Sequence, residues 1–143
     1  MTWTKKMPKN PVVAVCGATG AVGQEMLKVL AQRDFPAAEI IPLASARSAG
    51  KDVAFKDGTL TVREMTDASF DGIDIALFSA GAGISQKFRP AAVAAGAVMI
   101  DNSSAFRMEE GVPLVVPEVN ADMIKTHEGV IANPNCSTIQ MVV

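Results

Sequence analysis

Short apolar runs alternate along this chain with segments whose apolar residues recur at helical spacing. We predict strands for the runs at 11–16, 39–44, 74–79, 98–101 and 130–132. Helices are predicted at 21–33, 85–95 and 120–125, with a further short helix from residue 137. Small aliphatic residues dominate the runs, as they do in strands that helices cover on both faces. The pattern predicts an α/β fold with a doubly wound, mostly parallel sheet.

Three local features refine this prediction. Asp57-Gly58 separates two extended stretches within 53–64, which is a hairpin signal. Pro90 is compatible with a helix only near the first turn, because proline lacks the N–H that a helix interior needs. Asn120 is expected to cap the N-terminus of the helix that follows it.

Composition excludes several classes of function. The net charge is −2 and there is no block of basic residues, so neither nucleic acid nor an anionic membrane is an expected partner. The 143 residues suit one domain, residues 1–143. No apolar run approaches the roughly 20 residues of a membrane span, and residues 1–10 lack the apolar core of a secretory signal. The two cysteines have no disulfide-framework spacing, which favours a reduced, cytoplasmic setting.

Glycines recur at every third position directly after the first predicted strand, at Gly17, Gly20 and Gly23. A glycine turn between a strand and a helix lets a pyrophosphate approach the backbone, where the N–H groups of the helix end face its charge. The spacing G-x-x-G-x-x-G differs from the commoner G-x-G-x-x-G, and a plain glycine-rich turn is the alternative. The context of strand and helix favours a Rossmann-like nucleotide site.

The residues after the second predicted strand indicate which nucleotide it binds. An NAD site usually carries Asp or Glu there to hold the ribose 2′-hydroxyl, but no acid occurs before Asp52. Arg47 can pair with a 2′-phosphate, and Ser45 and Ser48 can donate hydrogen bonds to it. This favours NADP, although Arg47 could also be an ordinary solvated loop charge.

Cys136 follows an apolar strand and an Asn-Pro-Asn turn, at the predicted start of a helix. The helix N-terminus favours the thiolate, which is the form that attacks carbonyls. The backbone N–H groups of Cys136 and Ser137 could help to hold an oxyanion. A buried structural thiol is the usual alternative for a lone cysteine, and it is what we expect for Cys16.

Arg107 lies beyond the fourth strand and is a candidate anchor for phosphate or carboxylate. On its own it would more often be a surface arginine. His127, the one histidine, is better explained by capping or solvation at a helix end than by base catalysis. No residues have the spacing of a metal site.

Six segments together resemble aspartate-β-semialdehyde dehydrogenase. They are GATGAVG (17–23), SARSAGK (45–51), SAG (79–81), DNSSAFRM (101–108), VPEVN (116–120) and NPNCST (133–138). The resemblance implies an NADP-dependent enzyme of lysine, methionine and threonine biosynthesis. Such an enzyme interconverts aspartyl β-phosphate and aspartate β-semialdehyde, with inorganic phosphate as co-substrate.

The resemblance also assigns residues by position. It implies that Cys136 is the nucleophile and that Asn135 orients the reacting carbonyl. It implies that Arg107, with Asn102 beside it, binds phosphate. The residues expected at the cofactor are Gly17, Thr19, Gly20, Ala21, Val22, Gly23, Ser45, Arg47, Ser48, Ser79, Ala80 and Gly81.

Two related families fit less well. N-acetylglutamyl-phosphate reductase typically has its cysteine in a Gly-Cys-Tyr context, and glyceraldehyde-3-phosphate dehydrogenase has Ser-Cys-Thr-Thr and an acid after the second strand. A non-catalytic nucleotide-binding module of the same fold is a further alternative. Cys136, Asn135 and Arg107 together favour the semialdehyde enzyme.

The resemblance implies that this chain lacks the second domain of the family. The family's second domain supplies a histidine acid/base and further substrate residues, which have no counterpart here. We therefore expect this chain to be the cofactor-binding half, with little turnover alone and with exposed apolar surface that the rest would cover. The complete enzyme is expected to be a homodimer or homotetramer.

Overall fold

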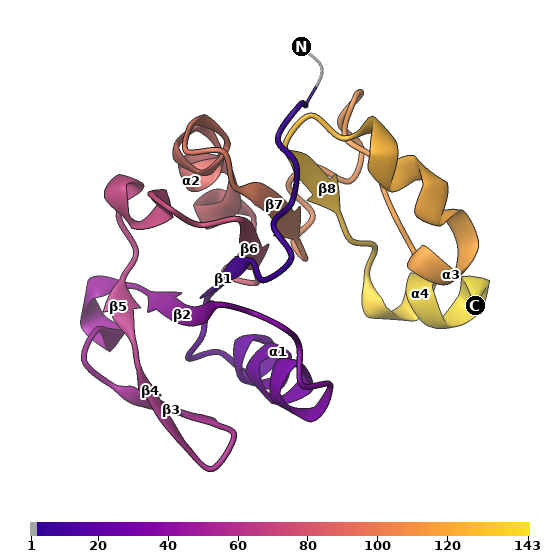
Figure 1. Cartoon of the computed structure of the whole chain (residues 1–143). Coiled ribbons are helices and arrows are strands. Elements are labelled where there is room, and N and C mark those ends of the chain that lie inside the picture. The colour runs from indigo at the N-terminus through magenta and orange to yellow at the C-terminus, as the bar shows by residue number, and fades with distance from the viewer. Residues whose placement is uncertain (1–2) are drawn as a thin grey trace.

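The computed structural model describes residues 3–143 and contains a six-stranded sheet in the order β5-β2-β1-β6-β7-β8 (Figure 1). All neighbouring strands of this sheet run parallel. The strands are β1 (Val12–Cys16), β2 (Glu39–Ala44), β5 (Arg63–Glu64), β6 (Ile75–Phe78), β7 (Val98–Asp101) and β8 (Val130–Ala132). The predicted doubly wound parallel sheet is confirmed.

Helices cover both faces of the sheet (Figure 1). On one face lie α1 and a separate antiparallel hairpin of β3 and β4, and on the other lies α2. The bounds are α1 (Ala21–Gln32), β3 (Asp52–Phe55), β4 (Gly58–Thr61), α2 (Ala82–Ala94), α3 (Pro117–Asn120) and α4 (Cys136–Val142). Three 3₁₀ turns complete the elements: η1 (Ala46–Ser48), η2 (Asp67–Phe70) and η3 (Ala121–Thr126).

The central strand β1 buries side chains on both faces, which explains its continuous apolar sequence. Val15 packs with Leu27 of α1, whereas Ala14 and Cys16 pack in the cluster that contains Phe88 of α2. Cys16 is fully buried, and burial raises the pKa of its thiol above the ordinary value. Its predicted place in the core is confirmed.

The predicted hairpin at 53–64 differs from the structure in the position of its turn and in its last two residues. Phe55 pairs with Gly58, so the two-residue turn is Lys56-Asp57, and Lys56 takes a positive φ of 51°. Arg63 and Glu64 leave the hairpin and form β5 at the edge of the main sheet. Parallel pairing with β2 over long range thus overrides the local hairpin pattern.

Helix α2 begins three residues earlier than predicted, which places Pro90 at its ninth residue rather than in its first turn. Proline there cannot donate to the carbonyl of Gln86 four residues earlier. Both Gln86 and Pro90 are exposed, so water can satisfy the freed carbonyl. The prediction that Pro90 fits a helix only near its first turn is therefore wrong.

Asn120 does not cap the helix that follows it. Its side chain accepts a hydrogen bond from the N–H of Val116 and donates one to the carbonyl of Leu114, each at 2.9 Å. The helical segment begins before it, at Pro117. Asn120 instead fixes the turn that ends the extended segment 113–116.

The segment 113–116 also covers the outer edge of β8. The N–H of Val115 donates to the carbonyl of Ala132 at 3.0 Å, and the N–H of Ala132 donates to the carbonyl of Pro113 at 2.9 Å. The sheet thus has little free edge. The segment 113–116 covers part of β8, and β5 at the opposite edge has only two residues.

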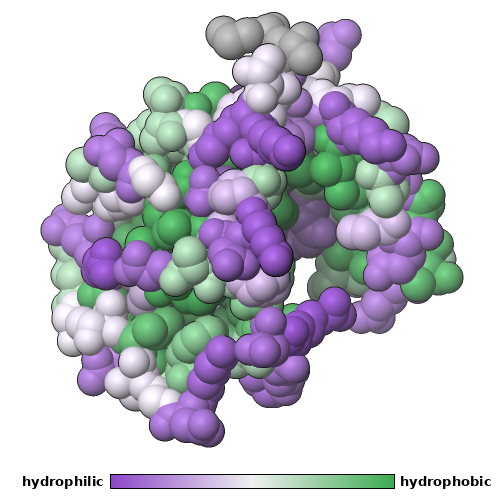
Figure 2. All heavy atoms as spheres, viewed as in Figure 1, coloured by the Kyte–Doolittle hydropathy of each residue, from purple (hydrophilic) through white to green (hydrophobic). Residues whose placement is uncertain are grey.

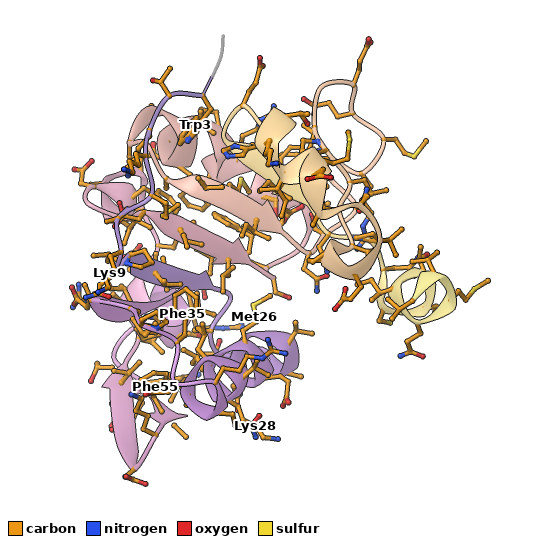
Figure 3. The ribbon with its side chains drawn as sticks, turned by 45° about the vertical axis from the view of Figure 1, so that its right-hand side comes forward. Trp3, Lys9, Met26, Lys28, Phe35 and Phe55 are labelled. Carbon is orange, nitrogen blue, oxygen red and sulfur yellow. The ribbon has the colours of Figure 1, made fainter. Side chains whose placement is uncertain are left out.

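The N-terminal segment crosses the amino ends of the strands. Lys5 pairs with Asp74 at 2.8 Å and donates to the carbonyl of Gly96 at 3.0 Å. Trp3 packs against His127, with ring centroids 5.5 Å apart, and lies at the top of Figure 3. The Nδ1 atom of His127 accepts the N–H of Gly129 at 2.9 Å, and burial lowers the pKa of this histidine.

Apolar surface lies open beside α1, as expected. A shallow groove lined by Val22, Met26, Val29 and Leu77 runs between α1 and β6, and Val22 is 46% exposed. Figure 3 shows Met26 on the side of α1 next to the sheet. Figure 2 shows a hollow between the α1 side of the molecule and the end formed by α3 and α4.

Two glycines bring β1, β6 and α1 into close contact. Gly17 has a φ of 91°, and a Cβ atom there would lie 2.3 Å from the carbonyl oxygen of Ser79. A Cβ atom at Gly23 would lie 2.1 Å from the carbonyl oxygen of Gly17. The spacing of these glycines therefore follows from backbone packing at the start of α1.

We expect Gly23→Ala to lower the free energy of unfolding by about 1–3 kcal/mol or more, because the new methyl group overlaps backbone atoms. Gly83→Ala is the matched control. Gly83 also lies in the first turn of a helix, but a Cβ atom there meets nothing within 4 Å. Urea denaturation should show Gly83→Ala unchanged or stabilised by up to about 1 kcal/mol. Equal losses in the two variants would contradict the packing argument.

We also expect stability to fall as the pH drops through the ordinary histidine range, and His127→Gln to reduce this dependence. The native state lowers the pKa of His127, so it binds fewer protons than the unfolded chain does there. This contribution is complete above the unfolded pKa and is lost as the pH falls through the folded pKa. Urea midpoints between pH 8 and pH 5 measure it. Parallel pH profiles of the two proteins would exclude the role of His127.

Candidate functional site

The loops that carry the predicted site residues all follow the carboxyl ends of the strands. These ends lie on the same side of the sheet, because the strands are parallel. The loops are 17–23 after β1, 45–48 after β2, 79–81 after β6, 102–107 after β7 and 133–136 after β8. The chain passes from β1 outward to β2, and from β6 outward to β7 on the other side. Ligands of open α/β sheets bind where the strand order reverses in this way.

A pocket of about 350 Å³ occupies this position. Gly17 and Thr19 line it from the glycine turn, Ser45 from the end of β2 and Ala80 from the end of β6. The structure thus brings together one or more residues of three predicted cofactor segments.

The glycine turn, of which Gly17 and Thr19 line the pocket, leads directly into helix α1. Helix α1 begins at Ala21. Its N-cap residue is Gly20, which has no side chain that could cap the helix, and its first turn contains no acidic residue. The first N–H groups of a helix have no partners within it. Those of Ala21, Val22 and Gly23 therefore suit an anion such as a pyrophosphate.

Arg47 and Ser48 lie in η1 beside the pocket but do not line it. Arg47 is exposed and Ser48 is half-buried. Ser79 is half-buried, and Gly81 precedes α2 with a φ of 90°. These four residues do not line the pocket, but each lies within two residues of one that does.

Seven pocket residues were not among the predicted cofactor residues: Ala44, Ala46, Glu64, Met65, Ile84, Lys87 and Phe88. Glu64 was missed because the stretch 53–64 was assigned to a hairpin, and Met65 directly follows that stretch. Ile84, Lys87 and Phe88 were missed because they belong to a helix with no motif, whereas Ala44 and Ala46 are the neighbours of the predicted Ser45. The helical spacing of Ile84 and Phe88 is the one signal that could have indicated a shared face. Glu64 also shows that an acid borders the pocket, from β5 rather than from β2.

Arg107 is held by the carbonyl groups at the ends of two neighbouring strands. Its Nε atom donates to the carbonyl of Asn133 at 2.9 Å, and one Nη atom donates to the carbonyl of Asn102 at 3.4 Å. The side chains of Asn102 and Asn133 are joined at 2.7 Å. Two of the five N–H groups of the guanidinium are thus used, which leaves three for an anion.

Cys136 is the first residue of α4 and is exposed. The Oδ1 atom of Asn135 caps the helix by accepting the N–H of Thr138 at 2.8 Å. This leaves the amide nitrogen of Asn135 available as a hydrogen-bond donor. Figure 3 shows α4 (yellow) standing away from the sheet. Its residue Met141 is 86% exposed.

The structure places the thiol and Arg107 in consecutive loops. Arg107 contacts Asn133, which lies three residues before Cys136. His127, by contrast, precedes β8 and packs at the amino ends of the strands, whereas Cys136 follows β8. This arrangement keeps the one histidine away from the thiol, in agreement with the non-catalytic role expected for it.

Two features are absent from residues 3–143. Within this range, no group of three or more His, Cys, Asp or Glu side chains is arranged to hold a metal ion. None of the helices of this range is both long and apolar enough to cross a membrane.

Comparison with known proteins agrees with the predicted family. Residues 12–127 match the family described as semialdehyde dehydrogenase, NAD binding domain. Aspartate-semialdehyde dehydrogenase of Bacillus subtilis (strain 168) is 60% identical over 130 residues, which cover 91% of this chain and 38% of the relative. The chain thus spans about two-fifths of the length of that relative.

Solved structures give the same result. Aspartate semialdehyde dehydrogenase II of Vibrio cholerae, complexed with ASA, is 49% identical with a TM-score of 0.89, covering 94% of this chain and 44% of that one. The Candida albicans enzyme with NADP is 26% identical with a TM-score of 0.75, covering 92% of this chain and 44% of that one. The match over residues 12–127 shows that this chain belongs to the semialdehyde dehydrogenase family, of which it carries the NAD-binding domain.

Proposed function

We propose that this chain is the NADP-binding and thiol-bearing part of an aspartate-semialdehyde dehydrogenase that works in the cytoplasm. The observation that carries the proposal is that a pocket beside the glycine turn, an arginine with free N–H groups and an exposed cysteine all follow the carboxyl ends of strands in one parallel sheet. A module that only bound nucleotides would not need Arg107 and Cys136 in adjoining loops.

NADP is the proposed cofactor. Its pyrophosphate would lie against the N–H groups at the start of α1, and its adenosine in the pocket between Ser45, Met65 and Phe88. Glu64 and Lys87 border that pocket with one charge of each sign, so the preference between NADP and NAD depends on η1. There Arg47 would pair with the 2′-phosphate, with Ser45 and Ser48 as hydrogen-bond donors.

The proposed reaction uses the thiolate of Cys136. Its sulfur attacks the acyl carbon of aspartyl β-phosphate, a C–S bond forms, and the C–O bond to phosphate breaks. The phosphate leaves toward the free N–H groups of Arg107, while the amide of Asn135 and the N–H groups at the start of α4 hold the carbonyl oxygen. When bound, NADPH supplies a hydride to the resulting thioester, and expulsion of the thiolate releases aspartate β-semialdehyde.

The rest of the enzyme would supply what this chain does not hold. Relatives of more than twice this length match it, so a second domain, in the same polypeptide or in a partner chain, is the proposed source of the acid/base histidine. The same part would cover the groove of Val22, Met26 and Val29. A homodimer or homotetramer is the proposed complete assembly.

We expect the chain to bind NADP more tightly than NAD, and Arg47→Ala to remove the difference. Loss of a charge-assisted contact to the 2′-phosphate should weaken NADP about tenfold or more, with the affinity for NAD unchanged. Isothermal titration calorimetry measures both affinities. Arg33→Ala, an exposed arginine just after α1, is the matched control and should change neither. Equal affinities of the unmodified chain for the two nucleotides would contradict the assignment of NADP.

The 143-residue chain alone is expected to give little or no turnover, because its one histidine lies at the other end of β8 from the thiol. The assay follows NADPH formation from aspartate semialdehyde, NADP and inorganic phosphate, with Cys136→Ala as control. Phosphate-dependent NADPH formation that Cys136→Ala abolishes would overturn this expectation and would show that the half-site suffices.

A further inference from the structure

A carboxylate that the proposed reaction does not use lies fully buried at the end of β7. Asp101 is 0% exposed, and no arginine, lysine or histidine of the described chain forms an ion pair with it. Its Oδ1 atom accepts the hydroxyl of Ser85 at 2.5 Å, and its Oδ2 atom accepts that of Ser103 at 2.6 Å. Burying a carboxyl group away from any counter-ion costs free energy, and an apolar residue would avoid that cost. Such a residue calls for a role beyond packing.

The Ser103 side of Asp101 leads to the arginine. The Oγ atom of Ser103 also accepts the N–H of Ala105 at 3.1 Å, which folds the loop back over the end of β7. Arg107 follows in the same loop and reaches the carbonyl groups of Asn102 and Asn133. The backbone of Asp101 itself accepts the N–H of Asn133 at 2.9 Å. Asp101 thus contacts both segments to which Arg107 is bound.

The Ser85 side leads to the nucleotide pocket. Ser85 is the fourth residue of α2 and is fully buried. Ile84 precedes it and Lys87 and Phe88 follow it, and all three line the pocket. The hydrogen bond between Ser85 and Asp101 therefore fixes the rotation of α2 that turns these side chains toward the pocket.

We propose that Asp101 is a positioning residue that serves both halves of the site. Through Ser103 it sets the loop that presents Arg107 to phosphate, and through Ser85 it sets the α2 wall of the nucleotide pocket. This inference rests on the proposed function, in which Arg107 binds phosphate and the pocket binds NADP.

Two serine variants separate the two roles, and each is the control for the other. We expect Ser103→Ala to weaken the binding of inorganic phosphate about three- to tenfold and to leave NADP affinity unchanged. Ser85→Ala should weaken NADP by a similar factor and leave phosphate unchanged. Asp101→Asn should weaken both. Urea denaturation of each variant establishes that it is folded at the temperature of the assay.

A spectroscopic signal distinguishes positioning from stability. The Nε–H group of Arg107 is bonded to the carbonyl of Asn133, so its ¹⁵N-detected resonance reports on the arginine directly. It is assigned by its absence in Arg107→Lys, and its shift on addition of phosphate gives the affinity. Ser103→Ala should move this resonance and speed its exchange with solvent, Ser103→Thr should restore it, and Ser85→Ala should leave it in place.

The outcomes separate the two proposals. If the unmodified chain bound neither phosphate nor NADP, the proposed function would fall, and the role of Asp101 with it. If it bound both, and the folded serine variants bound both equally well with an unmoved Arg107 resonance, only the role of Asp101 would be overturned. Weakening of both ligands to the same extent by either serine variant would show a general loss of structure and would also overturn it.

Discussion

The close approach of β1 and β6 beyond their carboxyl ends is the constraint on which the rest of this structure depends. Only glycine fits at residue 17, because a side chain there would overlap the carbonyl of Ser79, and only glycine fits at residue 23, which packs on Gly17 in turn. This contact lets α1 begin directly above β1, with its first N–H groups facing the point where the strand order reverses. The position of the pocket beside the glycine turn follows from it, because the ends of β2 and β6 form the walls beside that turn.

The two ends of the sheet are stabilised by different chemistry. At the carboxyl ends, polar groups form a connected set around Asp101, Asn133 and Arg107, and three N–H groups of the arginine remain for a ligand. At the amino ends, the Trp3 ring and the Lys5 ion pair fasten the N-terminal segment across the strands. The contacts at the amino ends hold the N-terminal segment to the sheet, whereas the polar groups at the carboxyl ends surround the candidate site. The histidine belongs to the contacts at the amino ends, which separates it from the thiol.

Local patterns in the sequence were sufficient for five strands of the main sheet (β1, β2, β6, β7 and β8), the glycine turn and the cysteine turn, because each of these depends on residues adjacent in the chain. The pocket walls were not predictable in the same way. Met65 reaches the pocket because β5 pairs with β2, and Phe88 reaches it because of how α2 is rotated on the sheet. Both depend on long-range packing that no short window contains. Asn120 shows the same limit on a smaller scale: its type is common at helix starts, but the extended segment before it takes its hydrogen bonds.

The covered edge of β8 has a consequence for the solution behaviour of the chain. An exposed edge strand offers unpaired N–H and C=O groups to other molecules and invites sheet-to-sheet aggregation. Here segment 113–116 occupies the outer side of β8 at Ala132, and β5 at the opposite edge is only two residues long. Intermolecular strand addition thus has little backbone to pair with at either side. The turn that carries Cys136 follows directly after β8, so the protected edge also keeps this exposed thiol clear of β-sheet association between copies.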